Sequence, residues 1–229
     1  MSSMTDFGAD SALFGGFLDR ADAGRQLADG LLHLKDEMPI VLALPRGGVP
    51  VAFEVARALA APLDVILVRK IGAPRQKELG LGAVVDGAHP HIVLNEDVVR
   101  AVGAGDEYIR QEAAREMMEI ERRRALYRPN RPPLEAEGRT VIVVDDGIAT
   151  GGTMKAVLKA LRELHPRALV LAVPVAPADS LAELAPFADE VVALATPEPF
   201  YAVGAYYRDF TQTSDEEVVD LLARANPKG

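Results

Sequence analysis

Five short apolar runs constrain the fold of this chain more than any other feature of its sequence. They occupy residues 40–44, 63–68, 140–144, 169–174 and 190–194. Near-continuous hydrophobicity over about four to eight residues is typical of a strand that is buried on both faces, as in a parallel sheet. We therefore predict an α/β fold with a five-stranded, mostly parallel sheet.

Helical spacing between these runs predicts that helices cover the sheet. After Asp19, apolar residues recur at Ala23, Leu27, Leu31 and Leu34. Two further helices are expected over residues 49–60 and 151–164. The order strand, loop, helix, strand at 40–68 is a βαβ unit, whose crossover is right-handed in nearly all proteins. The predicted fold is accordingly a doubly wound sheet.

Residues 72–138 interrupt this alternation and have the pattern of an insertion. Two apolar stretches flank a turn at 87–90, which predicts a hairpin, and we regard 72–95 as a candidate lid. Residues 105–127 predict a very polar helix with a thin apolar stripe. Because both halves of the chain supply strands that are incomplete alone, we expect a single domain over 1–229. Residues 1–16 are small, polar and glycine-rich, so we expect a loose terminus there.

The composition excludes several classes of protein. The chain of 229 residues has no cysteine, which excludes disulfides and cysteine-based zinc sites. Its formal net charge of −9 argues against nucleic acid or an anionic membrane as the main partner. No apolar run approaches the roughly 18 residues of a membrane span, and no signal-peptide pattern opens the sequence. We expect a cytoplasmic protein.

Two adjacent acids and a glycine-rich turn follow the third apolar run, in the stretch VVDDGIATGGT. Asp145 and Asp146 come at the carboxyl end of a predicted parallel strand, where α/β sheets bind ligands. The turn leads into a helix, whose first N–H groups and dipole favour an anion. Gly151 and Gly152 allow the backbone to approach a phosphate closely. The sequence therefore predicts an anion site beside an acidic pair.

The acidic pair needs hydroxyl donors or a divalent cation, because two close carboxylates repel each other. A 5-phosphoribosyl compound offers hydroxyls, a phosphate one sugar-length away and a metal-chelating group. The alternative is an Asp-rich turn that caps a helix, which explains one Asp and one Gly but not the whole run. A Walker-type loop and a dinucleotide fingerprint are both excluded, because their lysine and glycine patterns are missing.

The stretch VIVVDDGIATGGT resembles the 5-phosphoribosyl 1-pyrophosphate (PRPP) motif of the type I phosphoribosyltransferases. Residues 40–72 and 140–194 resemble the core of that family, and the flanks resemble its variable hood. The resemblance implies that Asp145 and Asp146 hold the ribose hydroxyls and contact Mg²⁺ indirectly, through PRPP. It implies a loop for the 5-phosphate, made of Ala149, Thr150, Gly151, Gly152 and Thr153.

Two basic stretches are candidates for holding the pyrophosphate. LPRGGV ends the first strand and resembles the pyrophosphate loop of the family, which assigns this role to Arg46, Gly47 and Gly48. The alternative is a strand-to-helix turn that merely needs glycines. Arg69 and Lys70 follow the second strand at the same sheet edge, so we expect them to contact pyrophosphate. The alternative for this pair is ordinary surface charge.

The acceptor site is the least specified part of the sequence. The chain has Ala149 where 6-oxopurine transferases carry an acid, which argues against hypoxanthine or guanine. Adenine transferases resemble this chain in two ways: they have an alanine at the position of Ala149, and they have an Arg-Lys pair followed by a glutamate. This resemblance makes Glu78 and Lys70 the candidate catalytic groups. An exposed loop glutamate is the alternative. Candidate acceptor contacts are Phe200, Tyr206 and Tyr207, which alternatively form a hydrophobic plug.

The predicted function is Mg²⁺-dependent transfer of a phosphoribosyl group from PRPP to a nitrogenous acceptor, for example a nucleobase, with release of pyrophosphate. Two alternatives stay open: a PRPP- or nucleotide-binding regulator without transferase activity, and a phosphoribosyl hydrolase. We also expect a homodimer whose partners are small molecules rather than nucleic acid or membrane.

Overall fold

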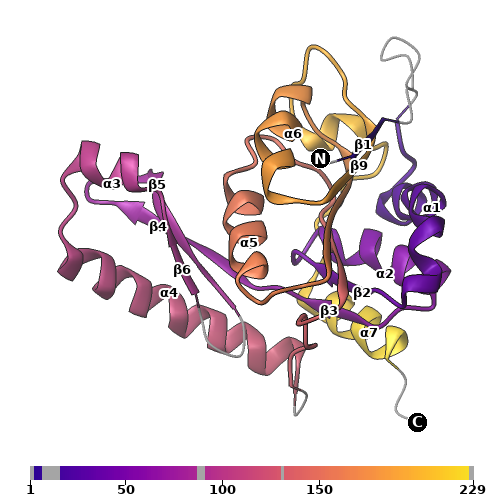
Figure 1. Ribbon diagram of the computed structural model, residues 1–229, viewed down its shortest axis with the longest axis horizontal. Helices are drawn as coiled ribbons and strands as arrows, with labels where there is room; N and C mark the ends of the chain where they lie inside the picture. The colour runs from indigo at the N-terminus through magenta and orange to yellow at the C-terminus, as the bar shows by residue number, and fades with distance from the viewer. Residues whose placement is uncertain (1–2, 7–15, 87–90, 130–131, 227–229) are drawn as a thin grey trace.

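The computed structural model describes residues 3–6, 16–86, 91–129 and 132–226. Its main sheet has six strands in the order β1-β9-β8-β7-β2-β3, and every pairing is parallel. The strands are β1 (Ser3–Asp6), β2 (Ile40–Ala43), β3 (Leu63–Val65), β7 (Thr140–Val144), β8 (Ala168–Val175) and β9 (Glu190–Ala195). Each of the five predicted apolar runs contributes a strand to this sheet, which confirms the expected fold class (Figure 1).

One strand of the main sheet was not predicted, and another ends earlier than predicted. Ser3–Asp6, expected to be part of a loose terminus, forms β1 and pairs with β9 at the edge of the sheet. An edge strand pairs through its main chain with one neighbour only, so it needs no apolar pattern. The run 63–68 does not form one strand, because β3 ends at Val65 and a strand of a second sheet begins at Val68.

Helices cover both faces of the main sheet, as the doubly wound prediction requires (Figure 1). One face carries α1 (Arg20–Leu31), α2 (Gly48–Leu59) and α7 (Asp215–Ala225), and the other carries α5 (Gly152–Arg162) and α6 (Ala178–Leu184). Short 3-10 helices lie at Leu32–Glu37, Ala185–Phe187 and Val203–Tyr206. Alternate strand residues enter opposite cores: Val41 packs with α1 and α2, whereas Leu42 packs with α5.

A second lobe projects from the sheet and contains the expected insertion (Figure 1). Its three strands are antiparallel, in the order β4-β5-β6, with β4 at Val68–Ala73, β5 at Gln76–Val85 and β6 at His91–Leu94. Helices α3 (Glu96–Val102) and α4 (Asp106–Tyr127) complete it. The predicted hairpin and the long polar helix are confirmed, although the turn at 87–90 lies outside the described residues.

The second half of β5 anchors the hairpin in the core. Leu81, Val84 and Val85 of β5 are fully buried and belong to the two cores that the sheet helices also form. This part of the proposed lid is therefore part of the packed interior. Arg75 and Gln76, at the turn between β4 and β5, are exposed. The lid at 72–95 stays a prediction, and the exposed turn at Arg75 and Gln76 is the part of it that the packed interior does not hold.

Candidate functional site

The two loops expected to bind ligand meet at one edge of the sheet. Because β2 pairs with β7 in parallel, with Ala43 opposite Val144, the chain leaves both strands side by side. A Cβ on Gly47 would lie 2.0 Å from Asp146 Oδ2, and a Cβ on Gly48 would lie 2.8 Å from the Val144 carbonyl oxygen. Both glycines are therefore required by this close approach. The peptide bond between Pro45 and Arg46 is cis.

Of the two acids, only Asp145 lines the cavity that lies between this sheet edge and the lobe. Burial and the neighbouring charge of Asp146 raise the pKa of Asp145 well above its ordinary value. One of its carboxylate oxygens, Oδ1, accepts a 2.8 Å hydrogen bond from the main-chain N–H of Asp146. Ionisation of a buried carboxyl group is unfavourable, so hydroxyl donors or a cation close to it stabilise the ionised form strongly. The environment of Asp145 thus favours a polyol or a metal-bound ligand.

Asp146 already has a partner in the structure. Its Oδ2 accepts a 2.8 Å hydrogen bond from Nε of Arg20, the first residue of α1. Burial raises the pKa of Asp146, and the hydrogen bond and charge of Arg20 oppose that rise. Arg20 also donates to the Thr211 carbonyl oxygen at 2.7 Å. Asp145 and Asp146, which the sequence treats as a pair, therefore have different environments.

The predicted phosphate loop connects the acids to α5. Gly151 caps this helix with φ +71°, a left-handed conformation that glycine adopts without strain. The side chains of Ala149, Thr150 and Thr153 are exposed. The first N–H groups of a helix have no partner within it, and its dipole favours negative charge there. The loop therefore has the geometry of an anion site.

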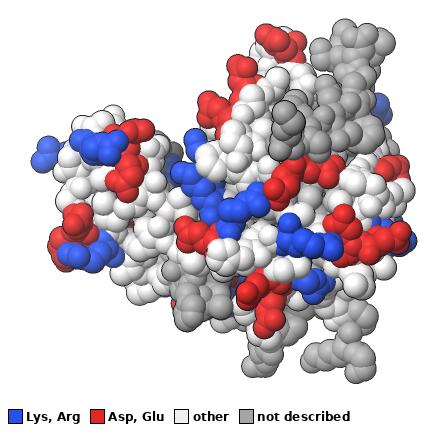
Figure 2. All heavy atoms as spheres, viewed as in Figure 1, with Lys and Arg blue, Asp and Glu red and all other residues white. Residues whose placement is uncertain are grey.

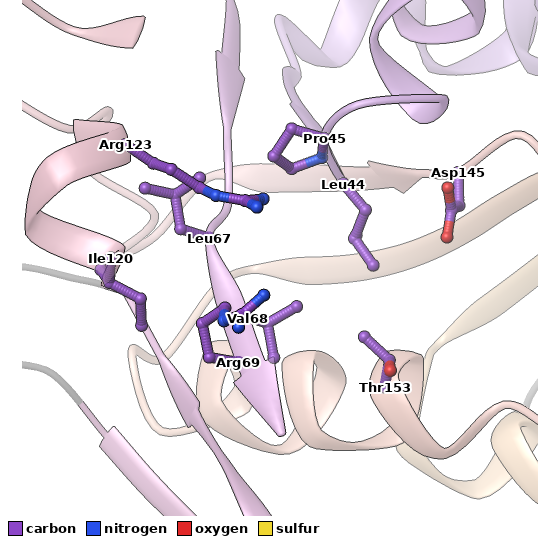
Figure 3. A pocket seen from close by; sticks show the side chains of 9 residues that line it. All are labelled: Leu44, Pro45, Leu67, Val68, Arg69, Ile120, Arg123, Asp145 and Thr153. Carbon is purple, nitrogen blue, oxygen red and sulfur yellow. The ribbon is translucent and has the colours of Figure 1, made fainter. Parts of the chain in front are cut away.

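A cavity of about 280 Å³ lies between the acidic pair and the lobe (Figure 3). It is lined by Leu44, Pro45, Leu67, Val68, Arg69, Ile120, Arg123, Asp145 and Thr153. Arg69 and Arg123 reach it from the lobe, whereas Asp145 faces it from the end of β7 and Thr153 from the start of α5 (Figure 3). The structure thus brings together residues from the acidic pair, both loops and α4.

Three predicted pyrophosphate residues are placed differently from one another. Arg69, on β4, faces the cavity with Asp145, and its Nε lies 2.7 Å from Glu116 Oε2. Lys70 follows it and lines another cavity, of about 630 Å³, which Thr150, Gly152 and Thr153 of the phosphate loop also line. The reason is that successive residues of a strand point to opposite faces. Arg46 lies 3.7 Å from Asp215, at the start of α7.

Tyr207, which the sequence predicts as a contact of the acceptor, has a different place in the structure. Its side chain is only 7% exposed and packs against the rings of Phe17 and Phe210. Its hydroxyl donates a 2.6 Å hydrogen bond to the main-chain oxygen of Asp146. Tyr207 therefore supports the acidic pair, and its ring is not free to stack on a substrate. Burial next to Asp146 raises its pKa.

The other acceptor candidates form a pair beside this cluster. The rings of Phe200 and Tyr206 are stacked, with centroids 5.4 Å apart, and both residues are half-buried. Glu78 lies in β5, close to the turn after β4, and its side chain is not described. The structure does not bring Phe200 or Tyr206 into the cavity of Asp145, because neither residue lines it.

Sequence reasoning missed Arg20 and Arg123. Arg20 is one of several charged residues in α1, and Arg123 is one of three consecutive arginines in α4. Charge on such helices is usually solvated surface. Only the packing of α1 and α4 against the sheet edge distinguishes these two arginines from their neighbours. No local sequence signal could have found them.

The surface near the site is basic although the chain is acidic overall. Figure 2 shows Lys and Arg side chains gathered near α5 and beside the junction with the lobe. Clustered positive charge raises the local concentration of anionic ligands. Among the described residues, no group of three or more His, Asp or Glu side chains could hold a metal ion. Of the helices in the described ranges, none combines the length and the apolar run that a membrane span needs.

The doubly wound parallel sheet with its antiparallel lobe is the fold of a type I phosphoribosyltransferase. The chain belongs to the phosphoribosyl transferase family: the family model described as "Phosphoribosyl transferase domain" matches residues 18–193. This match covers β2, β3, β7, β8 and most of β9, together with the lobe and both loops.

Individual relatives agree with this assignment. The "Putative phosphoribosyl transferase" of Mycobacterium tuberculosis, found in strains CDC 1551 / Oshkosh and ATCC 25618 / H37Rv, is 51% identical over 211 residues. The match covers 92% of this chain and 47% of those proteins, so the chain spans about half the length of these curated relatives. The crystal structure of TT1426 from Thermus thermophilus is 47% identical, with a TM-score of 0.81, and the match covers 91% of this chain and 98% of that one.

Proposed function

We propose that this chain transfers a 5-phosphoribosyl group from PRPP to a nitrogenous acceptor and releases pyrophosphate. The observation that carries the proposal is the junction of the two loops. Gly47 and Gly48 lie directly against Asp145 and Asp146, and the anion loop that starts α5 follows these acids. A sugar that carries a phosphate at one end and a pyrophosphate at the other fits this arrangement.

Each part of PRPP has a matching group in the site. The main-chain N–H groups of residues 149–153 bind the 5-phosphate, with Thr150 and Thr153 donating from their hydroxyls. Asp145 accepts from the ribose hydroxyls, and Asp146 completes this contact while it stays bonded to Arg20. The loop of Arg46, Gly47 and Gly48 holds the pyrophosphate together with Arg69. Lys70 contributes positive charge from the neighbouring cavity, which it lines together with Thr150 and Thr153.

The reaction places opposite charges on the two halves of PRPP. As the bond between carbon 1 and the pyrophosphate oxygen breaks, positive charge develops on the ribose and the electron pair leaves with pyrophosphate. Preorganised donors stabilise such charge without reorganisation, which is usually the largest catalytic effect. The acceptor nitrogen then bonds to carbon 1 and loses a proton. Glu78 remains our candidate for the acid or base in this step.

The donor set fits Mg²⁺ that arrives with PRPP. Mg²⁺ usually keeps several waters and binds one or two carboxylates together with substrate phosphates. Asp145 and Asp146 supply that number of carboxylates, and burial together with the neighbouring charge of Asp146 raises the pKa of Asp145, so a nearby cation would stabilise its ionised form. Mg²⁺ would be held by PRPP near these two acids and would neutralise charge on the leaving pyrophosphate.

The acceptor, the oligomer and the compartment stay predictions. Phe200 and Tyr206 are the proposed contacts of the acceptor, whereas Tyr207 is left out because it is buried. We propose a small nitrogenous acceptor such as a nucleobase, a homodimer, a cytoplasmic location and a role in nucleoside salvage. Size measurement in solution tests the homodimer independently of the chemistry.

Calorimetric titration of PRPP, with and without Mg²⁺, tests the proposal directly. We expect Mg²⁺-dependent binding by the wild type and at least a tenfold loss in Asp145→Asn, since this change removes the charge that faces the ribose. Release of pyrophosphate is then measured with a panel of nucleobases. Release only with a base supports transfer, and release without any base indicates a hydrolase. Binding without release indicates a regulator, and a folded wild type that does not bind PRPP contradicts the proposal.

A further inference from the structure

The long helix of the lobe contributes a side chain to the cavity beside Asp145. Arg123 of α4 lines this cavity together with Arg69 of β4, and the two residues are far apart in the chain (Figure 3). We propose that Arg69 and Arg123 form a pair of guanidinium groups that binds the pyrophosphate group of PRPP. This inference rests on the proposed function and assigns Arg123 as a further binding residue for the leaving group.

Both guanidinium groups are held in place by glutamates of α4. Arg69 Nε lies 2.7 Å from Glu116 Oε2, and Arg123 Nε lies 2.8 Å from Glu119 Oε1. In each case the contact uses Nε, and within the described ranges neither arginine makes another hydrogen bond. The terminal nitrogens of both groups are therefore available to a ligand, while the glutamates fix their direction.

The apolar walls of the cavity strengthen the hydrogen bonds that its charged groups can form with a ligand. Leu44, Leu67 and Ile120 line it and are buried apolar residues. Arg69 and Arg123 keep 38% and 28% of their side chains exposed, so a ligand can reach them from solvent. Charge-assisted hydrogen bonds from arginine to phosphate are strong and often bidentate. Apolar walls lower the local dielectric constant and make such bonds stronger still.

The position of the pair relative to the other groups identifies the anion. Thr153 belongs to the loop for the 5-phosphate and Asp145 faces the ribose hydroxyls, so both are used by other parts of PRPP. Arg69 and Arg123 lie across the cavity from them (Figure 3). Pro45, which leads into the pyrophosphate loop, lines the same cavity. The remaining part of PRPP is its pyrophosphate, which carries the charge that two guanidinium groups complement.

The lobe is then part of the substrate site rather than an appendage. Helix α4 is mostly polar, and Ile109, Ala113 and Ile120 attach it to the core. Ile120 is one turn away from Arg123 on the same helix and lines the same cavity. The apolar contact therefore sets the position of the arginine that faces the leaving group.

Arg122 provides a matched control. It neighbours Arg123 and bonds to the same carboxylate, with Nε 2.8 Å from Glu119 Oε2, but it is 58% exposed and does not line the cavity. Arg122→Gln and Arg123→Gln thus remove the same charge from the same helix and the same partner. A difference between them reports on the cavity and not on α4 or on net charge.

The experiment titrates inorganic pyrophosphate, ribose 5-phosphate and PRPP into the wild type and both variants in the presence of Mg²⁺. We expect Arg123→Gln to weaken pyrophosphate binding at least tenfold and to leave ribose 5-phosphate binding unchanged. Arg122→Gln should change neither by more than twofold. Arg123→Lys should recover part of the loss, because lysine keeps the charge but lacks the planar fork.

The outcomes separate this inference from the proposed function. If Arg123→Gln binds pyrophosphate as the wild type does, the inference is wrong, and PRPP binding by the wild type still supports the proposed function. If Arg122→Gln and Arg123→Gln lose pyrophosphate binding equally, the effect is net charge and the inference is also wrong. A folded wild type that binds neither PRPP nor pyrophosphate overturns both.

Discussion

Arg20 Nε donates a 2.8 Å hydrogen bond to Asp146 Oδ2, so the start of α1 is fixed to the acid that follows β7. The same guanidinium group lies 3.9 Å from the centre of the Phe210 ring and bonds to the Thr211 carbonyl oxygen. Arg20 therefore joins three segments that are distant in the chain: the first helix, the acidic pair and the segment before α7. Nothing in the local sequence of α1 indicates this role.

Arg20→Gln should lower the free energy of unfolding by about 3 kcal/mol, the usual cost of breaking a largely buried ion pair. Without the guanidinium group, the pKa of Asp146 rises further, because burial is then less opposed. Urea denaturation followed by circular dichroism measures the loss. Arg25→Gln is the control, since Arg25 is an exposed residue of the same helix that lies 3.6 Å from Asp22, and it should cost less than about 0.5 kcal/mol. Equal costs would contradict the role of Arg20.

The strands and the loops of the main sheet could be predicted because each depends on a local pattern. Continuous apolar runs identified β2, β7, β8 and β9, and the motif after β7 identified the turn that leads into α5. Both patterns lie within about a dozen consecutive residues, where burial and helix capping act directly on the sequence. The hairpin and α4 were predictable for the same reason.

The features that were missed depend on contacts between distant segments. The main chain of Ser3–Asp6 pairs with β9, which has no side-chain signature in the terminus itself. The run 63–68 looks continuous, but its last residue enters another sheet because the chain turns after β3. Tyr207 was expected to face a substrate, and the tertiary packing of Phe17 and Phe210 buries it instead.

Asp145→Asn should stabilise the protein while it weakens PRPP binding at least tenfold. The folded pKa of Asp145 lies well above its ordinary value of 3.8. At a pH between 3.8 and the raised pKa, the folded chain therefore binds more protons than the unfolded chain. The free energy of unfolding of the wild type therefore falls as the pH rises through this range. Asparagine does not ionise, so the variant does not lose this stability. We expect a gain of about 1 kcal/mol at pH 8, in the range typical of such changes at functional sites. The gain should be smaller at pH 5.

Thermal and urea unfolding at the two pH values measure this effect. Asp146→Asn is the comparison, because it removes an acid that Arg20 already neutralises in part. That variant should lose stability, since the buried guanidinium group loses its charged partner. If Asp145→Asn is less stable than the wild type at pH 8, Asp145 is satisfied in the fold and the argument from its environment is wrong.

Gly47→Ala should separate the pyrophosphate loop from the acidic pair. The new Cβ would lie 2.0 Å from Asp146 Oδ2, and Arg20 holds that carboxylate in place, so either the loop or the acid must move. We expect a loss of about 1–3 kcal/mol in stability, as for other overpacked sites, and at least tenfold weaker PRPP binding by calorimetry. Gly105→Ala, where no atom lies within 4 Å of the new Cβ, should match the wild type in both measurements. Wild-type affinity in Gly47→Ala would show that the loop does not need this close approach.

Arg128 joins the lobe to the main sheet through a buried ionic cluster. The residue follows α4, is 4% exposed, and pairs with Asp86 at the end of β5 and with Asp64 of β3, the latter at 3.3 Å. It also donates to the Val65 carbonyl oxygen at 3.2 Å. Asp86 contacts Arg124 as well, so one carboxylate holds two arginines from the end of the long helix. The position of α4, and with it that of Arg123, depends on this cluster.

Asp86→Asn should therefore cost about 3–5 kcal/mol, because it leaves buried guanidinium charge without its main partner. Urea denaturation provides the measurement, with Asp220→Asn as the control, since Asp220 forms an exposed 3.1 Å ion pair with Arg224 and should cost less than about 0.5 kcal/mol. A folded Asp86→Asn protein should also bind pyrophosphate more weakly, because a displaced α4 takes Arg123 away from the cavity. A cost below about 1 kcal/mol, with unchanged pyrophosphate binding, would mean that the apolar contacts of Ile109, Ala113 and Ile120 are sufficient to place the helix.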